Sequence, residues 1–187
     1  MIAIMSDLIY RLSPLSVSER TIDAGALIFL QGGPVRVLHI VRTGTVHLVR
    51  HQRDGATAVL QRATAEKILA EASVYSDTYL CDGLAVSPTT VSLVPVAHVR
   101  RLLEADGSFA NLWAAYLASE LQAVRKRAEI MSLKTVKAKL GAWLAWNDGA
   151  LPTKGAWTQL ADDIGVSPEA LYREIAKGLR AGPLKDE

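Results

Sequence analysis

Residues 108–131 read SFANLWAAYLASELQAVRKRAEIM. Small and apolar residues recur there at alternating steps of four and three, at Ala110, Ala114, Leu117, Leu121, Val124, Ala128 and Met131. This period of about 3.5 residues, unbroken by proline or glycine, is typical of a helix that carries one apolar seam along its length. We therefore predict a single helix of roughly 35 Å, at about 1.5 Å per residue.

The seam allows two interpretations. The helix packs along its own domain, or it pairs with the same helix of a second copy of the chain. Alanines permit close helix approach, and the basic run at Arg125, Lys126 and Arg127 lies beside the seam, which favours the pair. The predicted dimerisation residues are Ala114, Leu117, Leu121, Val124, Ala128 and Met131.

Length and composition limit the classes of protein to consider. The chain has 187 residues, half of them hydrophobic, which suffices for a packed core and excludes a disordered chain. The single cysteine, Cys81, excludes an intramolecular disulfide framework and a multi-cysteine metal site, and it fits a cytoplasmic protein. The first residues do not have the pattern of a signal peptide, and no run of about 18 apolar residues predicts a membrane span.

Charge is distributed unevenly, although the formal net charge is only +2. Residues 121–147 contain one acidic residue, Glu129, and the basic residues Arg125, Lys126, Arg127, Lys134, Lys137 and Lys139. A local positive excess of this kind attracts phosphate groups, although many charge runs are only solvated helix faces.

The first hundred residues are predicted to form an antiparallel sheet. Short β-rich runs alternate with glycine from residue 21 onward, strands are expected at residues 37–41 and 45–49, and Asp54-Gly55 is a strong hairpin signal. A spacing of roughly ten residues per strand is typical of a barrel or roll. A short helix followed by a turn is expected at residues 6–20, a helical turn at 66–76, a strand at 84–94, and a short helix at 95–103.

The last third is predicted to be helical. A helix is expected over residues 132–148, with Trp143 and Trp146 contributing to core packing. Thr158 is expected to cap a following short helix, and Gly165 suits the tight turn after it. Ser167 and Pro168 have the cap and first-position signature of a second helix, with Leu171 pointing back to the core. This spacing predicts a helix-turn-helix; a plain helical hairpin is the alternative.

The order of these motifs resembles the CRP/FNR family of transcription regulators. The residues that carry the resemblance are the run GALIFLQG at 25–32, Gly44-Thr45-Val46, Ala70-Glu71, Val94-Pro95, the long helix and the helix-turn-helix, over roughly residues 15–180. The resemblance implies an α+β fold in three parts. These are a cyclic-nucleotide-binding-like antiparallel β-roll (double-stranded, jelly-roll-like) at residues 1–107, a dimerisation helix at 108–131 and a helix-turn-helix domain at 132–187.

The resemblance also implies which residues contact DNA: Ser167, Glu169, Ala170, Arg173 and Lys177. A carboxylate such as Glu169 accepts a hydrogen bond from cytosine, and Arg173 can donate two to guanine. Ser167 and Lys177 would contact phosphates. Pro168 replaces a residue that makes a base contact in the family, and residues 182–187 are too few for the full two-stranded wing of the family. Residues 148–187 also carry more acidic than basic side chains.

The resemblance places an effector pocket at Glu71, Cys81 and Asp82. Cyclic-nucleotide-binding members use a Gly-Glu pair and an Arg followed by a hydroxyl residue, whereas this chain has Ala70 before Glu71, Cys81 at the Arg position and Asp82 at the hydroxyl position. Between Lys67 and Arg100 there is no Arg or Lys, and a buried phosphate without a cation is unfavourable. We therefore expect neither cyclic AMP nor cyclic GMP to bind with useful affinity.

Other cofactors and activities find less support. One cysteine is too few for an iron–sulfur cluster of the FNR type. Haem would need an axial ligand among His39, His47, His51, His98 and Cys81. Cys81 is either a redox sensor or a half-buried thiol without such a role. No P-loop, GxSxG or HExxH motif or other metal-ligand spacing predicts an enzyme or a metal site.

The prediction is a cytoplasmic, homodimeric transcription regulator that reads a palindromic site and is not an enzyme. Its expected partners are double-stranded DNA, a second copy of the chain, RNA polymerase and an unidentified small-molecule effector, with no membrane. The alternative is a dimeric β-roll adaptor or ligand-sensing protein that does not bind DNA.

Overall fold

The computed structural model describes residues 2–181 of the chain. The chain divides into two compact units, residues 1–119 and 120–187, and the division falls inside the long helix α3 (Gly107–Ser132). The helix predicted at residues 108–131 is therefore present. Within residues 2–181, no helix is both long and apolar enough to cross a membrane.

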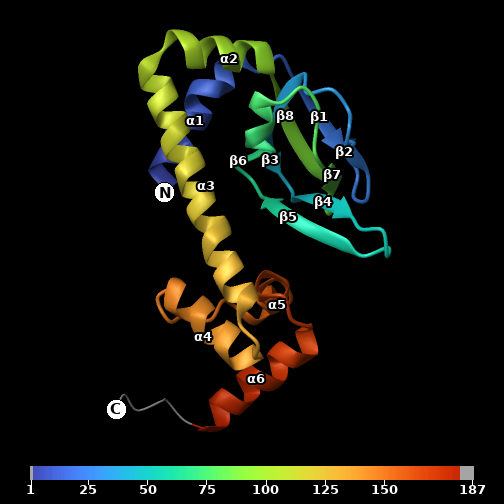
Figure 1. The fold of residues 1–187 in the computed structure, drawn as a ribbon, viewed down its shortest axis with the longest axis vertical. Helices are drawn as coiled ribbons and strands as arrows, with labels where there is room; N and C mark the ends of the chain where they lie inside the picture. Colours follow the sequence, from blue (N-terminus) through green and yellow to red (C-terminus); the bar gives the residue numbers. More distant parts are fainter. Residues whose placement is uncertain (1, 182–187) are drawn as a thin grey trace. The chain divides into compact units, whose positions relative to one another are not determined.

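The first unit is built on two four-stranded antiparallel sheets (Figure 1). Their strands are β1 (Ser18–Ile22), β2 (Leu27–Phe29), β3 (Val37–Thr43), β4 (Val46–His51), β5 (Thr57–Ala63), β6 (Lys67–Leu69), β7 (Asp82–Ala85) and β8 (Thr89–Pro95). One sheet has the order β1-β8-β3-β6 and the other β2-β7-β4-β5. The predicted antiparallel roll is confirmed.

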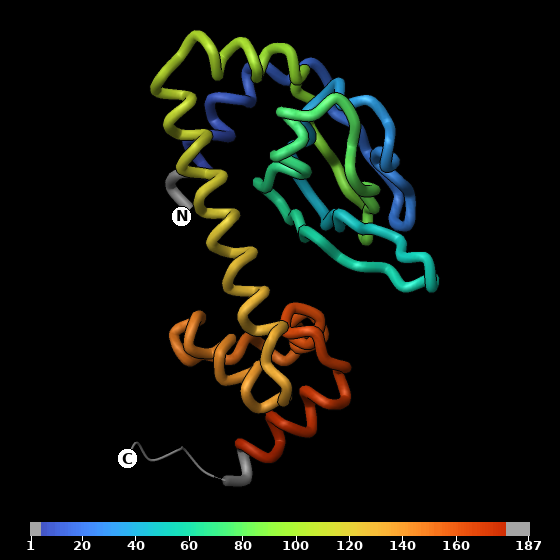
Figure 2. Tube along the Cα trace, in the orientation of Figure 1, coloured from blue at the N-terminus to red at the C-terminus, as the bar shows by residue number. Residues whose placement is uncertain are grey.

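Two turns between consecutive strands of the roll lie where glycine occurs in the sequence. Asp54 and Gly55 lie in the hairpin turn between β4 and β5, which protrudes from the roll in Figure 2 (cyan). Gly44, between β3 and β4, has a φ of +82°, and a Cβ atom there would lie 2.3 Å from the Pro88 carbonyl oxygen. Only glycine fits this close approach of two loops.

One side of the roll is covered by helices of the same unit: α1 (Ile2–Leu12), α2 (Val96–Ala105) and the first half of α3 (Figure 1). Alternate residues of β3 divide between two cores. Leu38 and Ile40 face the helices and pack with Phe109 and Trp113 of α3, whereas Val41 faces the interior of the roll. The period of two along a strand produces this division.

The first unit also contains two short 3₁₀ turns, one of which lies in a segment predicted to be a helical turn. The first is η1 (Ser13–Leu15) after α1, and the second is η2 (Glu71–Tyr75) after β6. The helical turn expected over residues 66–76 was therefore wrong in its first part, because residues 67–69 pair with β3 as strand β6. A three-residue strand depends on a distant partner and has no local signal of its own.

The second unit contains the end of α3, α4 (Val136–Trp146), the 3₁₀ turn η3 (Lys154–Ala156), α5 (Trp157–Ile164) and α6 (Pro168–Ala181). Its core joins Ile130, Leu140, Leu160, Ile164 and Leu171. The helix predicted at residues 132–148 begins later, because α3 runs through Ser132 and Thr135 caps α4 by accepting a hydrogen bond from the Ala138 N–H at 3.1 Å.

The two tryptophans of α4 differ in environment. Trp143 packs against this core, as predicted. Trp146 is 48% exposed, so its predicted core position was wrong. The Lys126 ammonium lies 4.3 Å from the centre of its indole ring, in a cation–π contact that covers part of the ring.

Candidate functional site

Helices α5 and α6 form a helix-turn-helix within the second unit. Gly165 ends α5 with a φ of +64°, and the Val166 N–H donates to the Ala161 carbonyl at 3.0 Å. Ala161 and Leu171 are fully buried where the two helices meet. The glycine turn and the inward position of Leu171 are as predicted. Thr158 was expected to cap α5 and does not, since it lies inside the helix with its hydroxyl 3.3 Å from the Tyr172 hydroxyl.

The start of α6 is set by its cap. The Ala170 N–H donates to the Ser167 hydroxyl at 3.2 Å, and Pro168 is the first helical residue. Glu169 follows, and the pKa of its carboxyl is lowered by hydrogen bonds from its own backbone N–H and the Ser167 hydroxyl and by the charge of Arg173. A carboxylate in the first turn also complements the helix dipole.

One face of α6 is exposed and polar while the opposite face is buried. Glu169, Arg173 and Lys177 follow one another at steps of four and are exposed. Leu171 and Ile175 lie in the core. Ser167 is exposed and Ala170 half-buried. Lys177 also approaches Glu174 at 3.5 Å. The five predicted DNA-contacting residues thus come together at one helix and its cap, and none is deeply buried.

The basic segment that ends α3 and forms α4 is only partly available. Arg125, Lys134 and Lys137 are exposed. Lys126 contacts Trp146, and the Lys139 ammonium donates to the Gly165 carbonyl at 3.2 Å. Lys139 therefore stabilises the turn of the helix-turn-helix, a role that its place in the sequence does not indicate.

The apolar seam of α3 is uncovered in the single chain. Leu121, Val124 and Met131 are 50%, 57% and 45% exposed. Ala114 and Ala128 are also exposed, and Leu117 is half-buried. The α3 residues that fill the core of the first unit lie on another face: Phe109, Trp113 and Tyr116. The aromatic residues therefore pack α3 onto its own unit, whereas most side chains of the seam are exposed in the single chain.

Glu71 lies in the first unit beside a glutamine that the sequence does not point to. Gln61 of β5 donates from Nε2 to Glu71 Oε2 at 2.7 Å, and its Oε1 accepts from the Ala70 N–H at 3.1 Å. Ala70 keeps a left-handed conformation, with a φ of +55°, although it is not glycine. The amide of Gln61 thus already bonds the Glu71 carboxylate, which the resemblance places in the effector pocket, and the neighbouring Ala70 N–H.

Cys81 lies close enough to Glu71 to sense its charge, and Asp82, the next residue, begins β7. Burial raises the pKa of the Cys81 thiol; Arg50 opposes this shift, and the carboxylates of Asp82 and Glu71 add to it. Asp82 is 9% exposed and accepts from the Gln31 N–H at 2.6 Å. The structure brings the three predicted pocket residues together, but a raised pKa opposes thiolate chemistry at Cys81.

Two side chains of β4, Arg50 and His51, also lie beside the predicted pocket residues and were not identified from the sequence as part of this region. Arg50 donates to the Leu80 carbonyl at 2.9 Å, and His51 Nε2 lies 3.6 Å from Asp82 Oδ2. The expectation of a pocket without a cation came from the absence of Arg and Lys between residues 67 and 100. The antiparallel pairing of β4 with β7 supplies Arg50 from outside that range, and a search by sequence spacing does not detect it.

Aromatic rings fill the interior of the roll nearby. Phe29 stacks on Tyr79 with ring centres 3.8 Å apart, and His39 lies 5.2 Å from Phe29. A Cβ atom on Gly83 would lie 2.9 Å from the Phe29 ring. Burial and the charge of Arg20 lower the pKa of His39 to about 4, so its imidazole is neutral near pH 7. Its Nδ1 has no hydrogen-bond partner among the described residues.

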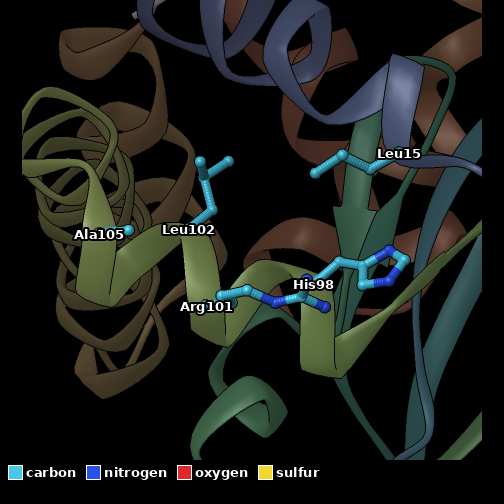
Figure 3. Close-up of a pocket in the computed structure, with 5 residues that line it drawn as sticks. All are labelled: Leu15, His98, Arg101, Leu102 and Ala105. Atoms are coloured by element: carbon cyan, nitrogen blue, oxygen red, sulfur yellow. The ribbon is translucent and has the colours of Figure 1, made fainter.

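The other three histidines lie on two elements. His47 and His51 lie on β4, and His98 lies on α2 at a pocket of about 310 Å³. Figure 3 shows four lining residues of this pocket on α2 and the fifth, Leu15, on η1. Among the described residues, no group of three or more His, Cys, Asp and Glu side chains is placed to hold a metal ion.

Known proteins resemble the chain in sequence over one segment and in fold over most of its length. The family model of the cyclic nucleotide-binding domain matches residues 19–106. No curated protein sequence matches significantly. FixK2 from Bradyrhizobium japonicum has a similar structure, with a TM-score of 0.69 and 18% identity, over 88% of this chain and 85% of its own.

Two further solved structures are similar over nearly their whole length. CLP from Xanthomonas campestris, a c-di-GMP-responsive global regulator, has a TM-score of 0.63 and 18% identity, over 97% of this chain and 95% of its own. TTHB099 from Thermus thermophilus, a transcriptional regulator of the CRP family, has a TM-score of 0.60 and 17% identity, over 90% and 88%.

Proposed function

We propose that the chain binds DNA as a homodimer in the cytoplasm and regulates transcription. The proposal is supported by the match of residues 19–106 to the family model of the cyclic nucleotide-binding domain and by a fold shared with solved structures that include a CRP-family transcriptional regulator. The observation that carries this proposal is the exposed face of α6. Arg173 is exposed there while Leu171 and Ile175 anchor the helix in the core. A recognition helix needs this division between base-reading and packing faces.

Dimerisation through α3 is the second part of the proposal. The supporting observation is the row of exposed apolar side chains at Leu121, Val124 and Met131, which would be buried against the same row of a second copy. Two linked recognition helices can read two half-sites about 34 Å apart, one turn of the double helix. The operator would then be a palindrome. In this proposal the protein acts through binding and is not an enzyme.

Binding to genomic fragments tests the proposal. Fragments that the purified full chain retains are selected and sequenced, and their affinity is measured against salt concentration. A regulator selects a palindromic motif, and its affinity falls steeply with salt because bound phosphates release counterions. A protein that retains no fragment selectively is instead the adaptor or ligand sensor that does not bind DNA.

The contacts in the effector pocket support the proposal that cyclic nucleotides are not its ligands. Because the Gln61 amide is bonded to Glu71 and Ala70, and Phe29 and Tyr79 fill the roll, cyclic AMP and cyclic GMP do not bind with useful affinity. Isothermal titration of the full chain with each nucleotide is expected to show no binding at micromolar concentrations. Micromolar affinity for either nucleotide would contradict the proposal.

A further inference from the structure

A cavity of about 280 Å³ lies in the second unit between α4 and α6. Its walls are branched aliphatic side chains, from Leu140 and Leu144 of α4, Leu151 of the following loop and Ile175 of α6. Leu151 is 38% exposed although it is apolar. The volume lies just below the ~300 Å³ at which pockets for drug-sized ligands begin, so it suits a smaller apolar body.

Two helix-interior glycines keep this cavity open. Gly141 of α4 and Gly178 of α6 both line it, and a Cβ atom added to either would meet nothing within 4 Å. Packing therefore requires neither glycine, and each weakens its helix relative to alanine. An alanine or leucine at these positions would extend into the hollow. Their shared location indicates that the hollow itself is what the two glycines preserve.

The charges at the rim favour an anionic head group. Lys137 and Glu174 are the two charged residues among those that line the cavity. The Glu174 carboxylate lies 3.5 Å from the Lys177 ammonium. Lys137 is exposed and has no ion-pair partner in the part of the chain that the structure describes. The cation at the rim is thus available to a ligand, while the carboxylate is already paired.

We propose that this cavity binds a small aliphatic monocarboxylate, with its chain among Leu140, Leu144 and Ile175 and its carboxylate beside the Lys137 ammonium. The site lies against the buried side of α6, away from the face with Arg173. The inference concerns ligand binding alone, so it stands or fails independently of whether the chain binds DNA.

Methyl NMR on the full chain tests the proposal with octanoate, octanol and octylamine as probes. Octanoate is expected to shift the methyl signals of Leu140, Leu144 and Ile175 in a saturable manner. Octanol should bind more weakly, and octylamine should bind least. Equal affinity for octylamine and octanoate, or no saturable shift with octanoate, would overturn the assignment.

Two charge variants separate the contribution of the rim charges to octanoate binding from that of the apolar walls. Lys137→Gln is expected to weaken octanoate binding about two- to fivefold, as for a solvent-exposed ion pair, and to leave octanol binding unchanged. Glu174→Gln should strengthen octanoate binding by a similar factor. An unchanged octanoate affinity in both variants would rule out the role of the rim charges.

Filling the cavity supplies the matched control. Gly141→Leu should abolish saturable binding of octanoate, whereas Ala145→Leu, on an exposed part of the same helix, should not. If Gly141→Leu does not fold, Gly141→Ala tests the same point, since it should raise the thermal midpoint and weaken octanoate. Octanoate binding that survives both Gly141 substitutions would place the ligand elsewhere and overturn the proposal.

Discussion

At the level of single residues, Arg173 tests the proposed reading of DNA most directly. Its side chain is exposed, one helical turn after Glu169. Arg173→Ala should cost about 1–3 kcal/mol of binding free energy and relax selectivity at one base pair in each half-site. Competition between the selected site and single-base variants measures both effects.

Lys154→Ala is the matched control for that experiment. Lys154 is an exposed cation of η3 in the same unit, so its loss removes one positive charge without touching α6. Selectivity should be retained in this variant. Equal selectivity of wild type and Arg173→Ala would remove the base-reading role from Arg173.

His39 gives a prediction about stability. The fold holds its imidazole neutral, with a pKa of about 4 against an ordinary 6.5, so between these values the unfolded chain binds the additional proton. The free energy of unfolding therefore decreases as the pH falls through this window. At about 1.4 kcal/mol per pKa unit, the loss reaches about 3 kcal/mol at pH 4.

Urea unfolding of wild type and His39→Leu between pH 7 and 4 measures this contribution. The variant should keep more of its pH 7 stability at pH 4, because no imidazole is left to bind a proton on unfolding. Circular dichroism establishes first that the variant is folded. The same loss of stability in both proteins would mean that another group causes it.

Among the elements, those with local signals could be predicted from the sequence. Gly165, Ser167 and Pro168 act within one turn of their own helices, so they identify α6 and its start. The seam identifies α3 by its period alone. Thr158 was misplaced because η3 leads directly into α5, with Ala156 before the first helical residue, and no residue there has a side-chain cap.

The parts that could not be predicted depend on contacts between distant residues. Gln61 reaches Glu71 because β5 and β6 meet in the roll, and Arg50 reaches the start of β7 because β4 pairs with it. Strand pairing brings together residues with no fixed separation in the sequence. Spacing therefore located Glu71, Cys81 and Asp82 but not the side chains that surround them.

The seam of α3 gives a prediction at the scale of one element. Val124 is 57% exposed in the single chain, so Val124→Glu should leave the fold intact. In the proposed dimer it would bury two unpaired carboxylates, at about 3–5 kcal/mol for each uncompensated charge. Sedimentation equilibrium should show a dimer for wild type and a monomer for the variant.

Gln122→Glu controls for the added charge, since Gln122 is exposed on the same helix but outside the seam. This variant should remain dimeric. A wild-type protein that sediments as a monomer, or a Val124→Glu variant that still dimerises, would exclude the α3 seam as the interface.

For the whole molecule, the proposal links the oligomeric state to the geometry of the operator. Two copies joined along α3 would hold their recognition helices at a fixed separation, which matches half-sites one turn of DNA apart, about 10–10.5 base pairs. Inserting five base pairs between the half-sites turns one of them by about half a turn, so that one dimer can no longer engage both.

Affinity for the expanded operator should fall to that of a single half-site, a loss of about 10²–10⁴-fold if the second contact acts as a tethered one. Fluorescence anisotropy with both operators measures the loss. The Val124→Glu monomer is expected to bind both operators equally and weakly, because it has no second recognition helix to misplace. Equal wild-type affinity for both operators would show that the two helix-turn-helix units act independently, and the dimer would then contribute nothing to operator choice.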